Sequence, residues 1–151
     1  MRTGTLTLRI TSALDHVFLV GLSVRGICAG VSLDTAAADA VELCVVEAVN
    51  NAIEHAYREQ PGQPVEVDVE FESELLRIMV RDRGETMDWA AICARAERSD
   101  PEDMLSEGGR GIFIMRSLMD TVTYRSAGGW NTLTLVKRLP DAVIPARNAA
   151  R

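Results

Sequence analysis

The stretch from Asp34 to Arg58 constrains the fold most, because it is the longest run with one helical periodicity. Asp34 is suited to cap its start, and the turn-rich sequence PGQP at 61–64 stops it. Small and apolar side chains recur along one face of this helix: Val41, Cys44, Val45, Ala48, Ala52 and Ala56. A helix with such a stripe must bury it against a second layer of structure.

Alternation of apolar and polar residues predicts the strands of that second layer. The expected strands are Thr5–Ile10, Val65–Glu72, Leu75–Asp82, Thr121–Arg125 and Asn131–Lys137. Further helices are expected at Ala13–Gly30 and Gly111–Met119, a weaker one at Asp88–Glu97, and a mobile loop at Arg98–Gly109. This order predicts an α+β fold, a two-layer sandwich with a mixed, mostly antiparallel sheet covered by helices on one face.

Composition indicates one soluble domain. The chain has 151 residues, 47% of them hydrophobic, so residues 1–138 can form a single core, with 139–151 as a flexible tail. Sixteen basic against 22 acidic residues give a net charge of −6, which argues against direct nucleic-acid or membrane binding.

The three cysteines lack metal-type spacing and predict reduced, buried thiols. No apolar run is long enough to span a bilayer, so we expect a cytoplasmic protein.

A polar stripe lies beside the apolar stripe of the long helix. Glu47, Asn51, Glu54 or His55, and Arg58 follow each other at spacings that place them along one edge. Such a stripe, taken alone, is more often a solvated helix edge than a site.

Two glycine-containing turns add to this pattern. Asp82-x-Gly84 ends a strand, where a carboxylate could accept a hydrogen bond from an exocyclic amine and the glycine would leave room for a base. The sequence GGRG at 108–111 opens a helix, where backbone N–H groups and Arg110 could bind a phosphate. Taken alone, the first is an ordinary turn and the second a flexible hinge.

Together, Glu-x-x-x-Asn on a helix, Asp-x-Gly after a strand and Gly-x-Gly before a helix resemble the N, G1 and G2 boxes of the GHKL (Bergerat-fold) ATPases. The segment EAVNNAIEHAY at 47–57 resembles the N box of one branch, the RsbW/SpoIIAB-type anti-sigma factor serine/threonine-protein kinases. The resemblance covers about residues 5–138 and implies a Bergerat-type sandwich that binds ATP and Mg²⁺.

The resemblance implies roles for the residues of the first two boxes. Glu47 matches the general base that activates the attacking hydroxyl, and Asn51 matches the Mg²⁺ ligand that joins the metal to the triphosphate. Asp82 matches the carboxylate that binds the adenine amino group, with Gly84 in the turn beside it. His55 stands where the family often has histidine and is given a supporting role at the nucleotide.

The resemblance also implies contacts from the later part of the chain. Gly109, Arg110 and Gly111 match the phosphate-contacting end of the lid, and Thr132 matches a threonine near adenine on a late strand. The sequence departs from the family at Thr86, where a second glycine is common, and at Trp130 and Asn131, where a Gly-Thr pair is common.

Two functions follow from the resemblance. The first is a homodimeric kinase that phosphorylates a serine on a small STAS-type anti-anti-sigma protein and otherwise sequesters a sigma factor. The alternative is a nucleotide-binding module that sequesters a partner without kinase turnover. The intact Glu47 and Asn51 favour the kinase, whereas Thr86 and Trp130 leave room for the alternative. A sensor histidine kinase fits less well, since His16 and His55 are the only histidines.

Overall fold

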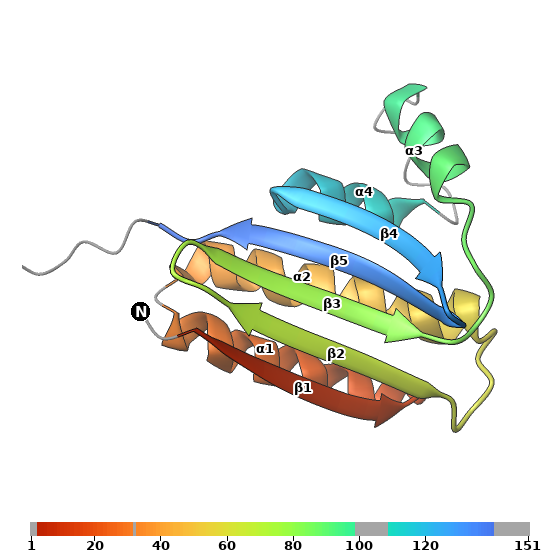
Figure 1. The fold of residues 1–151 in the computed structure, drawn as a ribbon, viewed down its shortest axis with the longest axis horizontal. Coiled ribbons are helices and arrows are strands. Elements are labelled where there is room, and N and C mark those ends of the chain that lie inside the picture. Colours follow the sequence, from red (N-terminus) through yellow and green to blue (C-terminus); the bar gives the residue numbers. More distant parts are fainter. Residues whose placement is uncertain (1–2, 32, 99–108, 141–151) are drawn as a thin grey trace, which may run out of the picture.

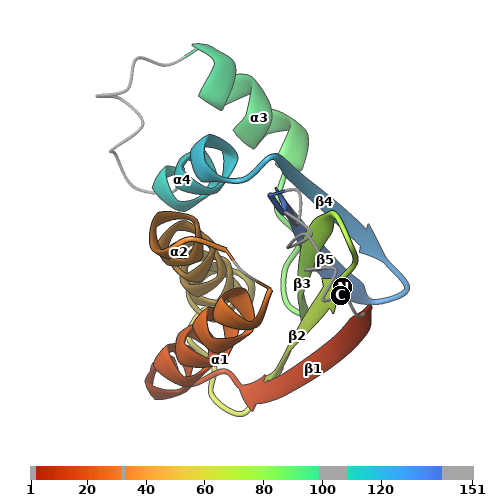
Figure 2. The ribbon, with the colours of Figure 1, turned by 90° about the vertical axis from the view of Figure 1, so that its left-hand side faces the viewer.

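Five strands form one sheet, and helices cover one of its faces (Figures 1 and 2). The computed structural model describes residues 3–31, 33–98 and 109–140. The strands are β1 (Gly4–Thr11), β2 (Pro64–Phe71), β3 (Leu75–Asp82), β4 (Thr121–Ala127) and β5 (Trp130–Arg138). The helical elements are η1 (Leu14–His16), α1 (Val17–Gly30), α2 (Thr35–Asn51), η2 (Ala52–Ala56), α3 (Trp89–Arg98) and α4 (Arg110–Leu118).

The strands are arranged in the order β1-β2-β3-β5-β4, and every pair is antiparallel. The α+β sandwich with helices on one face is thus confirmed, and within the described residues the sheet has no parallel pair. β3 reaches its neighbour β5 only after the chain has passed through α3, α4 and β4. The end of β3 therefore lies between elements that are distant in sequence.

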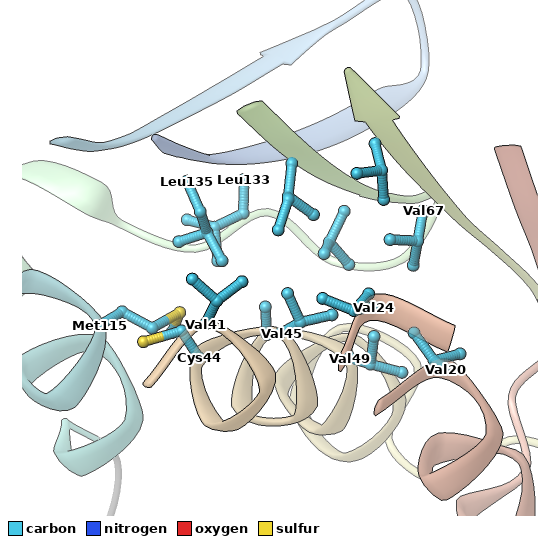
Figure 3. Packing of buried hydrophobic residues seen from close by; sticks show 14 of the residues in the cluster. Val20, Val24, Val41, Cys44, Val45, Val49, Val67, Met115, Leu133 and Leu135 are labelled. Atoms are coloured by element: carbon cyan, nitrogen blue, oxygen red, sulfur yellow. The ribbon is translucent and has the colours of Figure 1, made fainter. Parts of the chain in front are cut away.

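The core lies between the sheet and helices α1, α2 and α4 (Figure 3). Strict alternation on β3 and β5 turns Ile78, Val80, Leu133 and Leu135 toward the helices. The stripe predicted on α2 faces them, and all of its members except Ala56 are buried. Asp34 caps α2 as expected, since its side chain accepts a hydrogen bond of 2.7 Å from the Ala37 N–H.

The helix that carries the stripe does not stay α-helical to Arg58. α2 ends at Asn51 and continues as one π-helical turn, η2, in which the Tyr57 N–H donates to the Ala52 carbonyl. Arg58 and Glu59 then take left-handed backbone angles (φ 49° and 59°), which end the helix. π-Turns within helices often occur at functional sites, because the wider turn redirects side chains and carbonyls.

The remaining predictions differ in detail from the structure. The weak helix expected at 88–97 is present as α3, and the loop expected at 98–109 falls almost entirely outside the described residues. Leu139 belongs to the segment expected to be a tail, but it is buried and its N–H donates to the Glu74 carbonyl. The folded domain therefore extends at least to Leu139. None of the helices in the described ranges is long and apolar enough to cross a membrane.

Candidate nucleotide-binding site

A pocket of about 790 Å³ opens between the helix layer and the ends of the central strands. Its volume is within the range of small-molecule sites. Seven of the predicted site residues line it: Glu47, Asn51, His55, Asp82, Gly109, Arg110 and Gly111. Residues far apart in sequence thus share one cavity, and the polar stripe of the long helix borders it except at Arg58.

One end of the pocket is formed where α4 begins over α2. A β-carbon built on Gly111 would lie 3.0 Å from Glu47 Oε2, and 3.4 and 3.5 Å from the Asn51 amide atoms. The N-cap of α4 is Gly109, and among the described residues no side chain caps the start of this helix, so backbone N–H groups of its first turn are available to a ligand. A helix N-terminus beside a carboxylate and an amide can hold the phosphates of a nucleotide.

The other end is formed by the turn after β3. The Gly84 N–H donates to Asp82 Oδ1 at 2.8 Å, and the Glu85 N–H donates to the Ala56 carbonyl at 2.8 Å. Because a β-carbon on Gly84 would lie only 2.3 Å from that carbonyl oxygen, this close approach requires glycine. Gly84 thus adjoins the pocket rather than lining it.

The two ends are well separated. Glu47 and Ala56 are nine residues apart on one helix, which corresponds to roughly 13 Å at 1.5 Å per residue. The pocket therefore has one end that suits phosphates and another, beside Asp82, that suits a polar base edge.

Asp82 is a buried carboxylate. Burial raises its pKa above the usual 3.8, and hydrogen bonds from Asn131 and Gly84 partly offset this by stabilising the ionised form. The same pocket is also lined by the apolar side chains of Val80, Met87 and Leu133. A partly desolvated acceptor among apolar side chains is the arrangement expected for binding the amine of a flat base.

The structure corrects the prediction for Thr132. On β5 it is Asn131 that lies opposite Asp82, whereas Thr132 pairs with Arg81 and points to the uncovered face of the sheet. Successive side chains on a strand point to opposite faces, so Thr132 cannot share the face of Asn131. Thr132 does not line the pocket, and it is Asn131 whose side chain contacts Asp82.

Trp130 and Thr86, the two other departures from the family pattern, lie at different places relative to the pocket. Trp130 is on the uncovered face, where the Arg83 guanidinium stacks on its ring at 4.2 Å, so it does not obstruct the pocket. Thr86 lines the pocket and is exposed. His55 and Arg110 are also exposed at the pocket, whereas Arg58 forms an ion pair with Glu85.

Two tyrosines to which the sequence assigns no role lie at the turn after β3. The buried Tyr57 hydroxyl donates to the Pro64 carbonyl and accepts from the Arg83 N–H, each at 2.6 Å. The Tyr124 hydroxyl accepts from the Met87 N–H at 3.1 Å, and its ring stacks on Trp89 of α3. Burial raises the pKa of both phenols. Both tyrosines therefore fix the segment around the Asp82 turn as neutral side chains.

A magnesium ion would depend on few protein ligands here. The described residues contain no cluster of three or more His, Cys, Asp or Glu side chains that could hold a metal. The Asn51 amide oxygen fits a Mg²⁺ that receives its other ligands from phosphates and water, as is common for this ion.

Comparison with known proteins agrees with the geometry. The family described as histidine kinase-like ATPase domain matches residues 10–137. Serine-protein kinase RsbW of Staphylococcus aureus strain bovine RF122 / ET3-1 is 31% identical over 129 residues, covering 80% of this chain and 79% of that protein. The RsbW of S. aureus strain MSSA476 is 30% identical with the same coverage.

A solved structure supports the same fold. The crystal structure of the RsbU and RsbW domains of a Mycobacterium tuberculosis protein superposes with a TM-score of 0.65 at 19% identity. The match covers 90% of this chain but only 32% of that protein, so this chain spans about a third of its length. With the family match over most of its length and relatives above 30% identity, the chain belongs to the histidine kinase-like ATPase family, among its RsbW-type serine-protein kinases.

Proposed function

We propose that this kinase is an anti-sigma factor in a partner-switching module. It uses Mg-ATP to phosphorylate a serine on a small STAS-type anti-anti-sigma protein, and in its other state it sequesters a sigma factor. The observation that carries the proposal is the close approach of Gly111, at the start of α4, to the Glu47 carboxylate and the Asn51 amide, the groups we propose as base and metal ligand. The relatives named serine-protein kinase RsbW support it.

The chain supplies the steps of phosphoryl transfer as follows. Glu47 accepts the proton of the serine hydroxyl while the serine oxygen bonds to the γ-phosphorus of ATP. The bond between the γ-phosphorus and the oxygen that bridges it to the β-phosphate breaks, and ADP is released. The N–H groups at the start of α4, with Arg110, hold the phosphates. Asn51 is proposed to ligate Mg²⁺, which supplies charge neutralisation for the transferred group. Asp82 is proposed to bind the adenine amine, and His55 borders the nucleotide.

Phosphorylation would release the antagonist through charge. A phosphoserine adds nearly two negative charges at neutral pH, and in an interface built for a neutral serine it repels neighbouring carboxylates. Release of the antagonist then leaves the kinase free for the sigma factor, so the two partners exclude each other.

We further propose that the kinase is a homodimer that acts in the cytoplasm, without direct contact to nucleic acid or membrane. Phe18, Leu19 and Leu22 on α1 are 60%, 49% and 56% exposed, and Leu6 on the edge strand β1 is 42% exposed. α1 and β1 lie at one edge of the fold (Figure 2). Exposed apolar side chains grouped in this way support a protein interface.

The decisive experiment uses labelled ATP, Mg²⁺ and the cognate antagonist. Glu47→Gln should reduce label on the antagonist serine by about 10²- to 10⁴-fold with ATP affinity retained, because only the base is removed. Glu74→Gln, the same change on the exposed β2–β3 turn, is the matched control. Asn51→Ala should lose Mg-ATP binding. Tight ATP binding by the wild type without transfer to the antagonist would refute the kinase in favour of a sequestering module.

A further inference from the structure

Asn131 is a buried polar residue for which the proposed function has so far given no role. The residue is 3% exposed, and its side-chain amide nitrogen lies 2.8 Å from Asp82 Oδ1, 3.0 Å from the Gly84 carbonyl oxygen and 3.4 Å from the Glu85 carbonyl oxygen. An amide NH₂ has two hydrogens to donate. Both are therefore directed at the carboxylate and at the turn that follows it.

These contacts treat the two oxygens of Asp82 differently. Oδ1 accepts from Asn131 and from the Gly84 N–H, each at 2.8 Å, whereas no donor within the described residues reaches Oδ2. Oδ2 is not sealed in the protein either, because the only buried side-chain polar atom without a partner in the described part is Arg81 Nε. Oδ2 is therefore the oxygen that faces the pocket.

We propose that Asn131 is a positioning residue that locks the Asp82 carboxylate with Oδ2 toward the pocket and thereby sets the preference for adenine over a 6-oxo purine. This inference rests on the base-binding role proposed for Asp82. A carboxylate rotates readily about its terminal torsion, so without the lock part of the binding energy would go into ordering it. A fixed acceptor accepts from an exocyclic amine and repels a carbonyl oxygen at the same position.

The hydrogen bond from Asn131 also affects the ionisation of the Asp82 carboxylate. Hydrogen bonds from Asn131 and Gly84 stabilise the ionised carboxylate against the burial that raises its pKa. The groups facing Asp82 from neighbouring elements are Tyr57 and Tyr124, both neutral phenols. Asn131 is thus the side-chain donor to this carboxylate among the described residues.

The test compares affinities for ATP and inosine triphosphate, each with Mg²⁺, in the full chain. Asn131→Leu keeps the volume but removes the donor, and should weaken ATP binding by about tenfold, the equivalent of one lost hydrogen bond of about 1.4 kcal/mol. Its affinity for inosine triphosphate should stay the same or improve, so the ratio of the two affinities collapses. Asn131→Thr, with one hydroxyl donor, should retain part of the ratio. Thr134→Val, on the opposite face of the same strand, should leave both affinities unchanged.

The outcomes separate the inference from the function beneath it. An equal loss of affinity for both nucleotides in Asn131→Leu and Asn131→Thr would show a merely structural role and overturn the inference, as would an unchanged ATP affinity. If Asn131→Leu does not fold, the comparison is decided on Asn131→Thr alone. A wild type that binds both nucleotides equally, together with an Asp82→Asn variant of normal ATP affinity, would refute the base-binding role of Asp82 itself.

Discussion

Substitution of Gly84 by alanine tests whether the end of the pocket beside Asp82 depends on its contact with the long helix. The new β-carbon would lie 2.3 Å from the Ala56 carbonyl oxygen, 2.4 Å from its carbon and 2.8 Å from the Ala56 β-carbon. Ordinary contacts begin near 3.4 Å, and the obstructing atoms belong mostly to backbone that cannot rotate away. The turn must therefore move by about 1 Å away from η2.

This movement has a cost that can be worked out. It breaks the Glu85–Ala56 hydrogen bond and disturbs the bonds that join Gly84 to Asp82 and Asn131. Overpacking costs about 1–3 kcal/mol and a lost hydrogen bond about 1 kcal/mol, so the free energy of unfolding should fall by about 2–4 kcal/mol. For a domain of this size the midpoint of thermal unfolding should fall by roughly 5–15 °C. ATP affinity should fall as well, because Asp82 moves with the turn.

Denaturant and thermal unfolding measure the stability, and nucleotide titration measures the affinity. Gly26→Ala is the control, because a β-carbon there meets nothing within 4 Å and the residue lies inside α1. It should gain up to about 1 kcal/mol from its better helix propensity. The reasoning is refuted if the free energy of unfolding of Gly84→Ala lies within about 0.5 kcal/mol of the wild-type value and the variant binds ATP normally. A change that small is typical of a substitution at an unimportant surface site.

Three further predictions follow from the same geometry. Gly111→Ala should lower the rate of phosphoryl transfer while it changes the free energy of unfolding little, because the new β-carbon would lie 3.0 Å from Glu47 Oε2 and displace this carboxylate. Transfer assays and thermal unfolding of the same variant check this. Asp82→Asn should be more stable than the wild type at neutral pH, because burial raises the pKa of the carboxyl and thus penalises its ionised form. This advantage should shrink as pH falls through the raised pKa, where the wild type protonates, as unfolding measured from neutral to acid pH will show. Alkylation of the native protein at pH 8 should modify Cys93 first, since burial raises the pKa of the two thiols in α1 and α2 to about 11; mass spectrometry locates the label.

Periodicity alone predicted most of the fold, because both layers carry clear patterns. The bounds of β3 agree to the residue, and the stripe on α2 is buried as expected. The π-turn at Ala52–Ala56 was not predictable, since one wider turn hardly changes a helical pattern over five residues. Its effect is local but visible, because Ala56 leaves the buried stripe and its carbonyl turns to the Glu85 N–H.

The candidate site was predictable only where local sequence carries the chemistry. Glu47, Asn51 and Asp82 belong to short motifs whose spacing fixes their direction, and the pocket contains all three. The assignment of Thr132 failed because a shift of one residue along a strand reverses the face of every side chain. Alternation with Leu133 and Leu135 places Thr132 on the uncovered face. Which residue of β5 lies beside Asp82 follows from strand pairing, and pairing between distant strands cannot be read from either segment alone.

The position of the site on α2 explains how so small a domain can hold reactive groups in place. Glu47 lies between Cys44 and Ala48 in sequence, and both of these are buried against the sheet. A helix fixed by its core stripe fixes the neighbouring polar edge as well, so the base and the amide of Asn51 gain their rigidity from packing rather than from a further layer. The end of the pocket beside Asp82 is not carried by such a stripe. There the order is provided by two hydrogen bonds: the Tyr57 hydroxyl accepts from the Arg83 N–H, and the Asn131 amide donates to Asp82. We therefore expect substitutions at Tyr57 and Asn131 to affect nucleotide binding before they affect transfer.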